Sequence, residues 1–135
     1  EQSNEFCVNY LHSIKKSAKL LDISQSQALC IQTIPYDGIS QTHLAKKLFL
    51  DLSTLSRNLE KLSKLGFVIK EPSAFDSRSY IITLSKSGKE IYHNLNMHIQ
   101  NHLSIIYESL DLHEIDIMVE ILNKINWKFT LSHNE

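Results

Sequence analysis

Side chains that can donate hydrogen bonds are gathered in the segment of residues 53–66. At helical spacing they share one face, on which Glu60 is the only acid. The donors are Ser53, Thr54, Ser56, Arg57, Asn58, Lys61 and Lys64. Hydroxyl, amide and cationic groups together suit a polar, anionic partner, because each of them can donate to oxygen acceptors. The alternative is a solvated polar face on an ordinary helix, which this segment alone does not exclude.

A leucine stripe must position this face. Four leucines recur at helical spacing on the opposite side and predict an amphipathic helix that packs on a core: Leu55, Leu59, Leu62 and Leu65. Gly66 follows, where a helix commonly ends with a left-handed residue. A second short helix is predicted over residues 41–48, with a tight turn at residues 49–52. Two helices joined in this way, the second with a donor-rich face, are typical of a helix-turn-helix.

Charge is distributed unevenly along a chain whose net charge is only −1. Residues 40–90 hold nine Lys or Arg against five Asp or Glu, whereas residues 91–135 hold two against six. Residues 1–39 are close to balance, with three against four. Positive charge in the middle of the chain is what binding to phosphates requires. We therefore expect the acidic ends to face away from such a partner.

Capping signals and periodicity predict the other elements. Helices are expected over residues 5–21, from Ser24 to the neighbourhood of Pro35, over residues 86–109 and after Asp111. Runs of β-forming residues at 67–71 and 79–84 predict a β-hairpin directly after the helix-turn-helix. The terminal helices carry more apolar surface than so small a module can cover, which predicts a homodimer interface.

Composition excludes several classes of protein. At 135 residues the chain fits one domain. It has no apolar run of the roughly 20 residues that a membrane span needs and no signal peptide, so we expect a soluble, cytoplasmic protein without a membrane partner. Two cysteines without metal-ligand spacing suit a reducing compartment. The sequence does not begin with Met, and we expect a few residues to have been removed from its start.

Catalytic signatures are absent from the sequence. It contains no Gly-rich phosphate loop, nucleophile elbow, paired-carboxylate motif or metalloprotease signature. We therefore expect no enzymatic activity and no cofactor.

The central segment resembles the MarR (multiple antibiotic resistance regulator) family of winged-helix transcription factors. The resemblance covers residues 40–90 closely, and its strongest element is Asp76-x-Arg78 followed by Ser79 and then by Leu84-Ser85-x-x-Gly88. Further matching stretches are residues 44–48, 53–62 and 65–68. The family implies a mainly α fold with a small β-hairpin wing. A winged helix-turn-helix module over 40–85 would be flanked by a helical dimerisation region over 1–39 and 86–135.

The resemblance also implies a homodimer bound to double-stranded DNA. The helices of residues 53–65 would enter successive major grooves, so the operator would be a pseudo-palindrome with half-sites about 34–36 Å apart. Arg57 would bond guanine, and Arg78, braced by Asp76, would enter the minor groove from the wing. The remaining contacts to bases and phosphates would come from Gln41, Thr42, Ser53, Thr54, Ser56, Asn58 and Lys61. Leu52 departs from the family, where a polar residue is frequent.

Regulation is a second property that the resemblance implies. MarR relatives often respond to a small phenolic or lipophilic effector, held in a crevice between the dimer helices and the winged module. Five side chains could line such a pocket, although core packing explains each of them equally well: Tyr10, Ile14, Cys30, Tyr36 and His102.

Two other sensing chemistries have candidates. Cys7 lies where a peroxide-sensing branch carries its reactive thiol, but no cation stands beside it to lower its pKa, so we expect a buried structural thiol. His98 and His102 stand one helical turn apart, a spacing that can place two imidazoles on one metal, with His12 or His43 to complete the site. No carboxylate or cysteine is spaced to join them locally, and we expect surface or interface histidines.

These observations predict a homodimeric, sequence-specific DNA-binding transcriptional regulator, a repressor rather than an activator, modulated by a small-molecule effector. Two alternatives stay open: a thiol- or zinc-responsive regulator of the same fold, and a winged-helix protein-interaction module without an operator. Arg57 and Arg78 separate the last alternative from the others, because a protein-interaction module does not need a cation at both positions.

Overall fold

The structure of the protein is a computed structural model that describes residues 1–73 and 79–132. Its elements in chain order are α1 (Gln2–Leu20), α2 (Gln25–Thr33), β1 (Ile39–Ser40), α3 (Gln41–Leu48), α4 (Leu52–Lys64), β2 (Val68–Pro72), β3 (Tyr80–Leu84), α5 (Lys86–Glu108) and α6 (Leu112–Ser132). The chain forms two compact units, residues 1–100 and 101–135, and α5 runs from the first into the second. The predicted mainly α fold with a small β wing is confirmed.

Side-chain caps fix where the helices begin. Ser24 and Gln27 form the predicted capping box at the start of α2, and the Ser40 hydroxyl accepts from the backbone N–H of His43 at the start of α3. Asp111 and Glu114 exchange reciprocal hydrogen bonds of 2.9 Å at the start of α6. Because each cap satisfies a backbone group that the helix leaves unbonded, the sequence determines the starts of α2, α3 and α6 closely. α1 has no side-chain cap, and it begins at Gln2 rather than at the predicted residue 5.

The sheet has three antiparallel strands in the order β1-β3-β2, one more than predicted. β2 and β3 form the wing hairpin, with Val68 opposite Leu84. β1 pairs only Ile39 with Ile82 and Ser40 with Ile81. Two residues are too few to show a strand period, which explains why β1 was not predicted.

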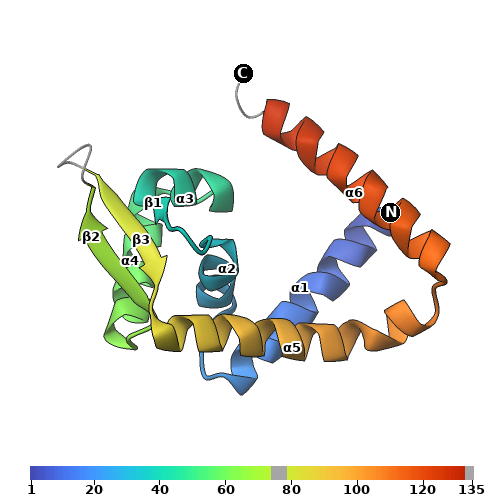
Figure 1. Cartoon of the computed structure of the whole chain (residues 1–135), viewed down its shortest axis with the longest axis horizontal. Helices are drawn as coiled ribbons and strands as arrows, with labels where there is room; N and C mark the ends of the chain where they lie inside the picture. Colours follow the sequence, from blue (N-terminus) through green and yellow to red (C-terminus); the bar gives the residue numbers. More distant parts are fainter. Residues whose placement is uncertain (74–78, 133–135) are drawn as a thin grey trace. The chain divides into compact units, whose positions relative to one another are not determined.

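One core serves the helix-turn-helix and the sheet. α2, α3 and α4 gather on one side of the β2–β3 hairpin (Figure 1), and α2 also packs against α1. The side chains that are almost fully buried include Ile14, Ile31, Leu44, Leu55, Leu62, Ile82 and Leu95. Leu59 completes the predicted stripe of α4, but Leu65 is 50% exposed, because the helix ends at Lys64 and Leu65 is its C-cap. Including Leu65 in the stripe was therefore wrong.

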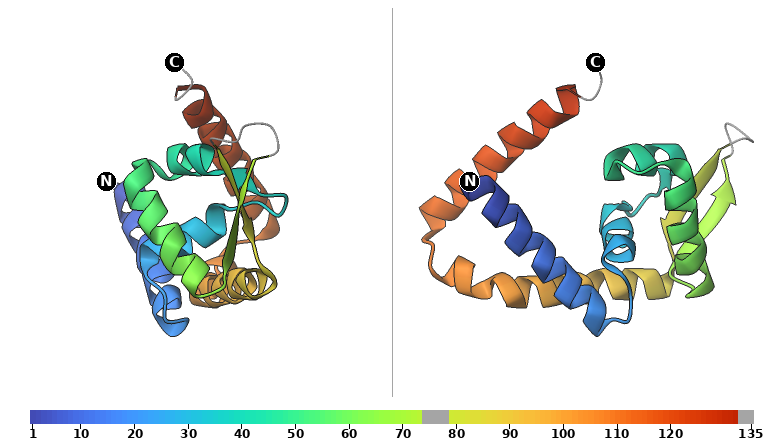
Figure 2. Two further views of the ribbon diagram at one scale, coloured as in Figure 1. Left: turned by 90° about the vertical axis from the view of Figure 1, so that its left-hand side faces the viewer. Right: turned by 180° about the vertical axis from the view of Figure 1, so that it is seen from behind.

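The segment after α4 is pinned to the start of α5. The backbone N–H of Ser85 donates to the carbonyl oxygen of Phe67 at 3.0 Å, and the Ser87 hydroxyl donates to that of Gly66 at 2.8 Å. Figure 2 shows the end of α4 next to the beginning of α5. A Cβ atom on Gly88 would collide with the Phe67 carbonyl oxygen, so only glycine fits there. This close approach gives a physical reason for the Leu84-Ser85-x-x-Gly88 pattern.

The α6 helix has apolar side chains around most of its circumference. None of its residues is buried. Its exposed large apolar side chains are Leu112, Ile117, Val119, Ile121, Leu122, Ile125, Trp127, Phe129 and Leu131. A helix that is apolar all round is normally covered in the folded assembly. No helix among the described residues is both long and apolar enough to cross a membrane.

Candidate nucleic-acid interface

Arg57 and Lys61 lie one helical turn apart on the outward face of α4. Both are exposed, because the buried leucines of α4 occupy the opposite side. Neither forms an ion pair with another residue in the part of the chain that the structure describes. Their donors therefore point to solvent and are available to an anionic partner.

The carboxylate of Asp51 caps α4 and holds two of the predicted contact residues. It accepts from the Thr54 backbone N–H at 2.8 Å and from the Thr54 hydroxyl at 2.7 Å, and the Ser53 hydroxyl donates to it as well. The hydrogen bond from Ser53 and those from Thr54 keep the pKa of Asp51 well below its usual range. Since both hydroxyl hydrogens are engaged with Asp51, Ser53 and Thr54 present acceptor lone pairs outward rather than donors.

Two hydrogen bonds tie α4 to the neighbouring helices. Gln41 Nε2 of α3 donates to the Ser56 hydroxyl at 2.7 Å, and Asn58 Nδ2 donates to the Ser26 hydroxyl of α2 at 2.8 Å. Ser56 and Asn58 are therefore half-buried, and Asn58 directs its amide toward α2. Both bonds fix the orientation of α4 within the helix-turn-helix.

Other charges around α4 are partly compensated. Lys64 pairs with Glu60 at 2.7 Å, and this hydrogen bond and the lysine charge lower the pKa of Glu60. At the start and end of α3, Thr42, Lys46 and Lys47 are exposed. Exposed cationic and polar groups thus extend from α4 onto α3, and the ion pairs among the described residues include none of Arg57, Lys61, Lys46 and Lys47.

Among the described residues of the two wing strands, one side chain is cationic, that of Lys70. Lys70 Nζ of β2 lies 4.2 Å from the centroid of the Tyr80 ring of β3, a cation–π contact across the hairpin. Asp76 and Arg78, predicted to contact the minor groove, lie outside the described residues. Their roles stay predictions.

The five residues predicted for an effector pocket lie in different environments. Ile14 and Cys30 are buried in the core of residues 1–100. Tyr36 is 70% exposed and contacts Tyr92 edge to face, with Lys89 over its ring. Tyr10 is 37% exposed and stacks on Phe6, and His102 is exposed on α5.

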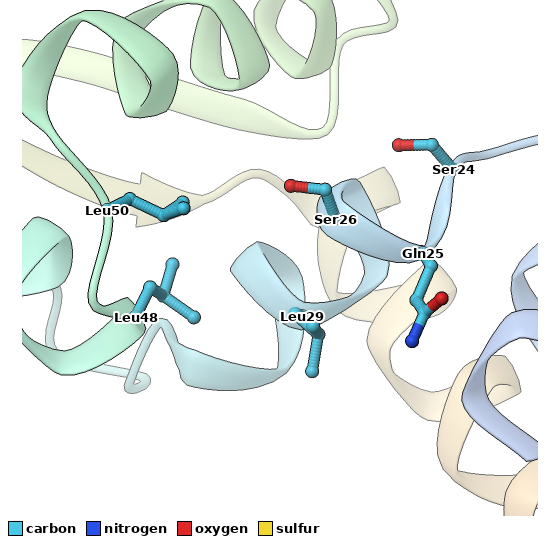
Figure 3. Close-up of a pocket in the computed structure, with 6 residues that line it drawn as sticks. All are labelled: Ser24, Gln25, Ser26, Leu29, Leu48 and Leu50. Carbon is cyan, nitrogen blue, oxygen red and sulfur yellow. The ribbon is translucent and has the colours of Figure 1, made fainter. Parts of the chain in front are cut away.

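The structure also contains a cavity that sequence reasoning missed. It has a volume of about 400 Å³ and is lined by Ser24, Gln25, Ser26, Leu29, Leu48 and Leu50. Figure 3 shows Leu48 and Leu50, at the end of α3 and in the following turn, projecting toward α2. Its walls come from segments about 20 residues apart in the sequence, so no local pattern could reveal it.

The two cysteines differ in exposure. Cys7 is exposed, so the expectation of a buried thiol there was wrong: the buried residues of α1 begin only at Ser13. Cys30 is fully buried, and this burial raises the pKa of its thiol to about 11. At neutral pH Cys30 therefore remains a thiol.

Potential metal ligands are dispersed in the described part of the chain. His98 is half-buried and His102 is exposed. Among residues 1–73 and 79–132, no three His, Cys, Asp or Glu side chains come close enough together to hold a metal ion.

A helix-turn-helix, a β2–β3 wing and an outward cationic face on α4 define a winged helix-turn-helix protein. Residues 21–79 match the sequence model of the MarR family. The chain is 28% identical over 110 residues to "Uncharacterized HTH-type transcriptional regulator YdgJ" of Bacillus subtilis. The aligned region covers 77% of this chain and 66% of that protein. The chain is 32% identical over 90 residues to "HTH-type transcriptional regulator SarZ" of Staphylococcus haemolyticus, covering 66% of this chain and 58% of that protein.

The fold is similar to that of solved MarR structures. The structure of a mutant MarR from E. coli complexed with operator DNA superposes with a TM-score of 0.72 at 22% identity, covering 92% of this chain and 90% of that one. The sequence of residues 21–79 is thus similar to the MarR family, and the fold is similar to that of a solved MarR protein. The chain spans less than two thirds of the length of the two sequence relatives.

Proposed function

We propose that this protein is a homodimeric transcriptional regulator, and a repressor, that binds a pseudo-palindromic site in double-stranded DNA. The observation that carries the proposal is the outward face of α4, where Arg57 and Lys61 are exposed on the second helix of a helix-turn-helix. The MarR structure of the same fold is a complex with operator DNA, which supports this assignment.

The proposed contacts follow from the donor geometry. Arg57 can bond guanine O6 and N7 together, and Lys61 can neutralise a phosphate. Ser53 and Thr54 accept hydrogen bonds from base amino groups while they donate to Asp51. Gln41 and Thr42 at the start of α3 suit backbone phosphates, and Ser56 and Asn58 chiefly hold α4 in place through their bonds to Gln41 and Ser26. Arg78, braced by Asp76, completes the site in the minor groove.

Dimerisation is proposed from the apolar surface of the terminal helices. In the single chain no α6 residue is buried, and Ile121, Trp127 and Phe129 are each at least half exposed. On α1, Phe6 and Leu11 are also exposed. Apolar surface of this extent is characteristic of an interface between subunits. A second copy of the chain, bound through these helices, would place a second α4 on the DNA.

Regulation by a small phenolic or lipophilic effector remains part of the proposal. Buried Ile14 and Cys30 would form the apolar floor of its site, and Tyr10 and Tyr36 would contribute aromatic groups. A thiol-responsive regulator of the same fold is the second candidate, and the exposure of Cys7 favours it because a sensing thiol must be accessible.

Titration of wild-type protein onto a mixed-sequence DNA duplex at several salt concentrations tests the proposal. We expect log affinity to fall with log salt by about 0.9 for each phosphate neutralised. Lys61→Ala should reduce the slope by about 1 in each subunit. Lys124→Ala is the matched control, since Lys124 pairs with Glu120 on α6, and should leave the slope unchanged. Absence of any DNA binding at low salt, with folded protein, would favour the protein-interaction alternative.

A further inference from the structure

Leu52 is an exposed apolar side chain at the N-terminal end of α4, next to the polar residues Asp51 and Ser53. It is the first residue of α4 and is 51% exposed, although the other leucines within this helix are buried. The hydrogen bonds of Asp51 to Ser53 and Thr54 hold the helix start around it. Its exposure therefore follows from the position at which α4 begins.

The direction of the side chain places it at the end of α4 that would enter the groove. Helical side chains tilt toward the N-terminus of their helix, so Leu52 extends beyond the first turn. Ser56 follows one turn later on the same side and bonds Gln41 of α3. In a helix-turn-helix, the N-terminal residues of the second helix are those that contact base edges.

The chemistry of the major groove limits what a leucine can recognise there. Base edges in this groove present hydrogen-bond donors and acceptors, and the only apolar group among them is the C5-methyl of thymine. A leucine forms no hydrogen bond, so it can distinguish a base only by burying that methyl group. We propose that Leu52 is a specificity-determining residue that contacts a thymine methyl, so that each half-site carries a thymine at this position. This inference rests on the proposed DNA-binding function.

Replacing thymine with deoxyuridine tests the inference, because it removes the methyl group and keeps the base pair. The full chain is titrated onto a duplex selected for binding, in which each thymine is replaced in turn. We expect one position per half-site at which the replacement weakens wild-type binding about fourfold, the size expected for one buried methyl group. Leu52→Ala should bring the ratio of thymine to deoxyuridine affinity at that position close to 1.

Two further variants serve as controls. Leu52→Met keeps an apolar side chain of similar volume and should retain the preference for thymine. Leu65→Ala removes a leucine of equal exposure at the other end of α4, and should leave the ratio unchanged. A thymine-to-deoxyuridine ratio that is the same in wild type and Leu52→Ala at every position would overturn the inference. If the selection yields no bound sequence, the proposed function itself fails.

Discussion

Arg57 is the residue on which sequence preference should depend most. Its guanidinium is exposed and, among the described residues, unpaired, so no internal contact has to break before it bonds a base. A bidentate contact to guanine discriminates by about 1–3 kcal/mol against another base. Lys61 can also approach DNA, but a lysine bonds phosphate as a point charge and carries little sequence information.

Arg57→Ala should therefore flatten the preference among DNA sequences. We expect about 1–3 kcal/mol of discrimination to be lost at one base pair in each half-site. Competition binding between the selected duplex and single-base variants measures this loss. Lys64→Ala is the control on the same helix, because Lys64 is already paired with Glu60, and it should preserve the preference. Equal discrimination by Arg57→Ala and wild type would remove Arg57 from the base contacts.

The exposure of a side chain was predicted correctly where the helical period alone determines it. The spacing of the leucines was sufficient to place Arg57 and Lys61 outward. It could not show that Asn58 turns to Ser26, since that partner lies 32 residues away in the sequence. The exposure of Cys7 was missed for a similar reason: the periodicity of α1 does not say how far along the helix its packing partner reaches.

Among the elements, the start of α4 depends on one carboxylate. The folded-state pKa of Asp51 lies below its ordinary value of 3.8, because the hydroxyl of Ser53 and the groups of Thr54 donate to the charged form. A carboxyl group whose pKa is lowered by folding stabilises the folded state at pH values above its ordinary pKa. This stabilisation is lost as the pH falls through the folded-state pKa.

Asp51→Asn should show this dependence, because asparagine caps a helix about as well as aspartate but does not titrate. We expect the variant to unfold at a lower temperature than wild type at pH 7, and the difference to shrink as the pH falls below 3.8. Thermal unfolding followed by circular dichroism at a series of pH values measures it. A difference that stays constant down to pH 2 would contradict the role of the charged cap.

The contact between α5 and the segment after α4 depends on Gly88. The added methyl group of Gly88→Ala would meet the backbone carbonyl of Phe67, which cannot move without breaking its bond to Ser85. We expect a loss of about 1–3 kcal/mol in the free energy of unfolding, typical of overpacking. Ser87→Ala, which removes the hydroxyl bonds to the Gly66 carbonyl and to the Ser85 hydroxyl, should cost about 0.5–1.5 kcal/mol. Denaturant unfolding at one protein concentration compares them, and a fully stable Gly88→Ala would show that the junction can open.

Elements were predictable where their signals are local. The bounds of α3, the cap of α2 and the wing strands follow from residues within a few positions of one another. The strand β1 was not predictable, because its two residues become a strand only by pairing with β3 some 40 residues later. The predicted leucine stripe extended one residue beyond the end of α4 at Lys64, and Leu65, as the C-cap, no longer shares the buried face of the helix.

For the whole molecule, we expect a dimer of two copies of the chain. The α6 helix is too apolar to remain uncovered, and DNA contact by two α4 helices needs a two-fold axis. Light scattering should give a particle of twice 15.6 kDa at micromolar concentration. Leu122→Asp combined with Ile125→Asp should dissociate it, whereas Asn126→Asp on the same helix should not. A wild-type monomer at tens of micromolar would contradict the dimer.

Selection of bound duplexes from a random DNA pool, with wild-type protein at near-physiological salt, is the experiment that tests sequence-specific DNA binding by the dimer. We expect enrichment of a pseudo-palindrome whose half-sites are separated by about one helical turn, about 34–36 Å. Such a result would mean that two α4 helices bind one operator together. Failure to enrich any sequence, with protein shown to be folded and dimeric, would contradict sequence-specific DNA binding and would identify the winged helix as a surface for another kind of partner.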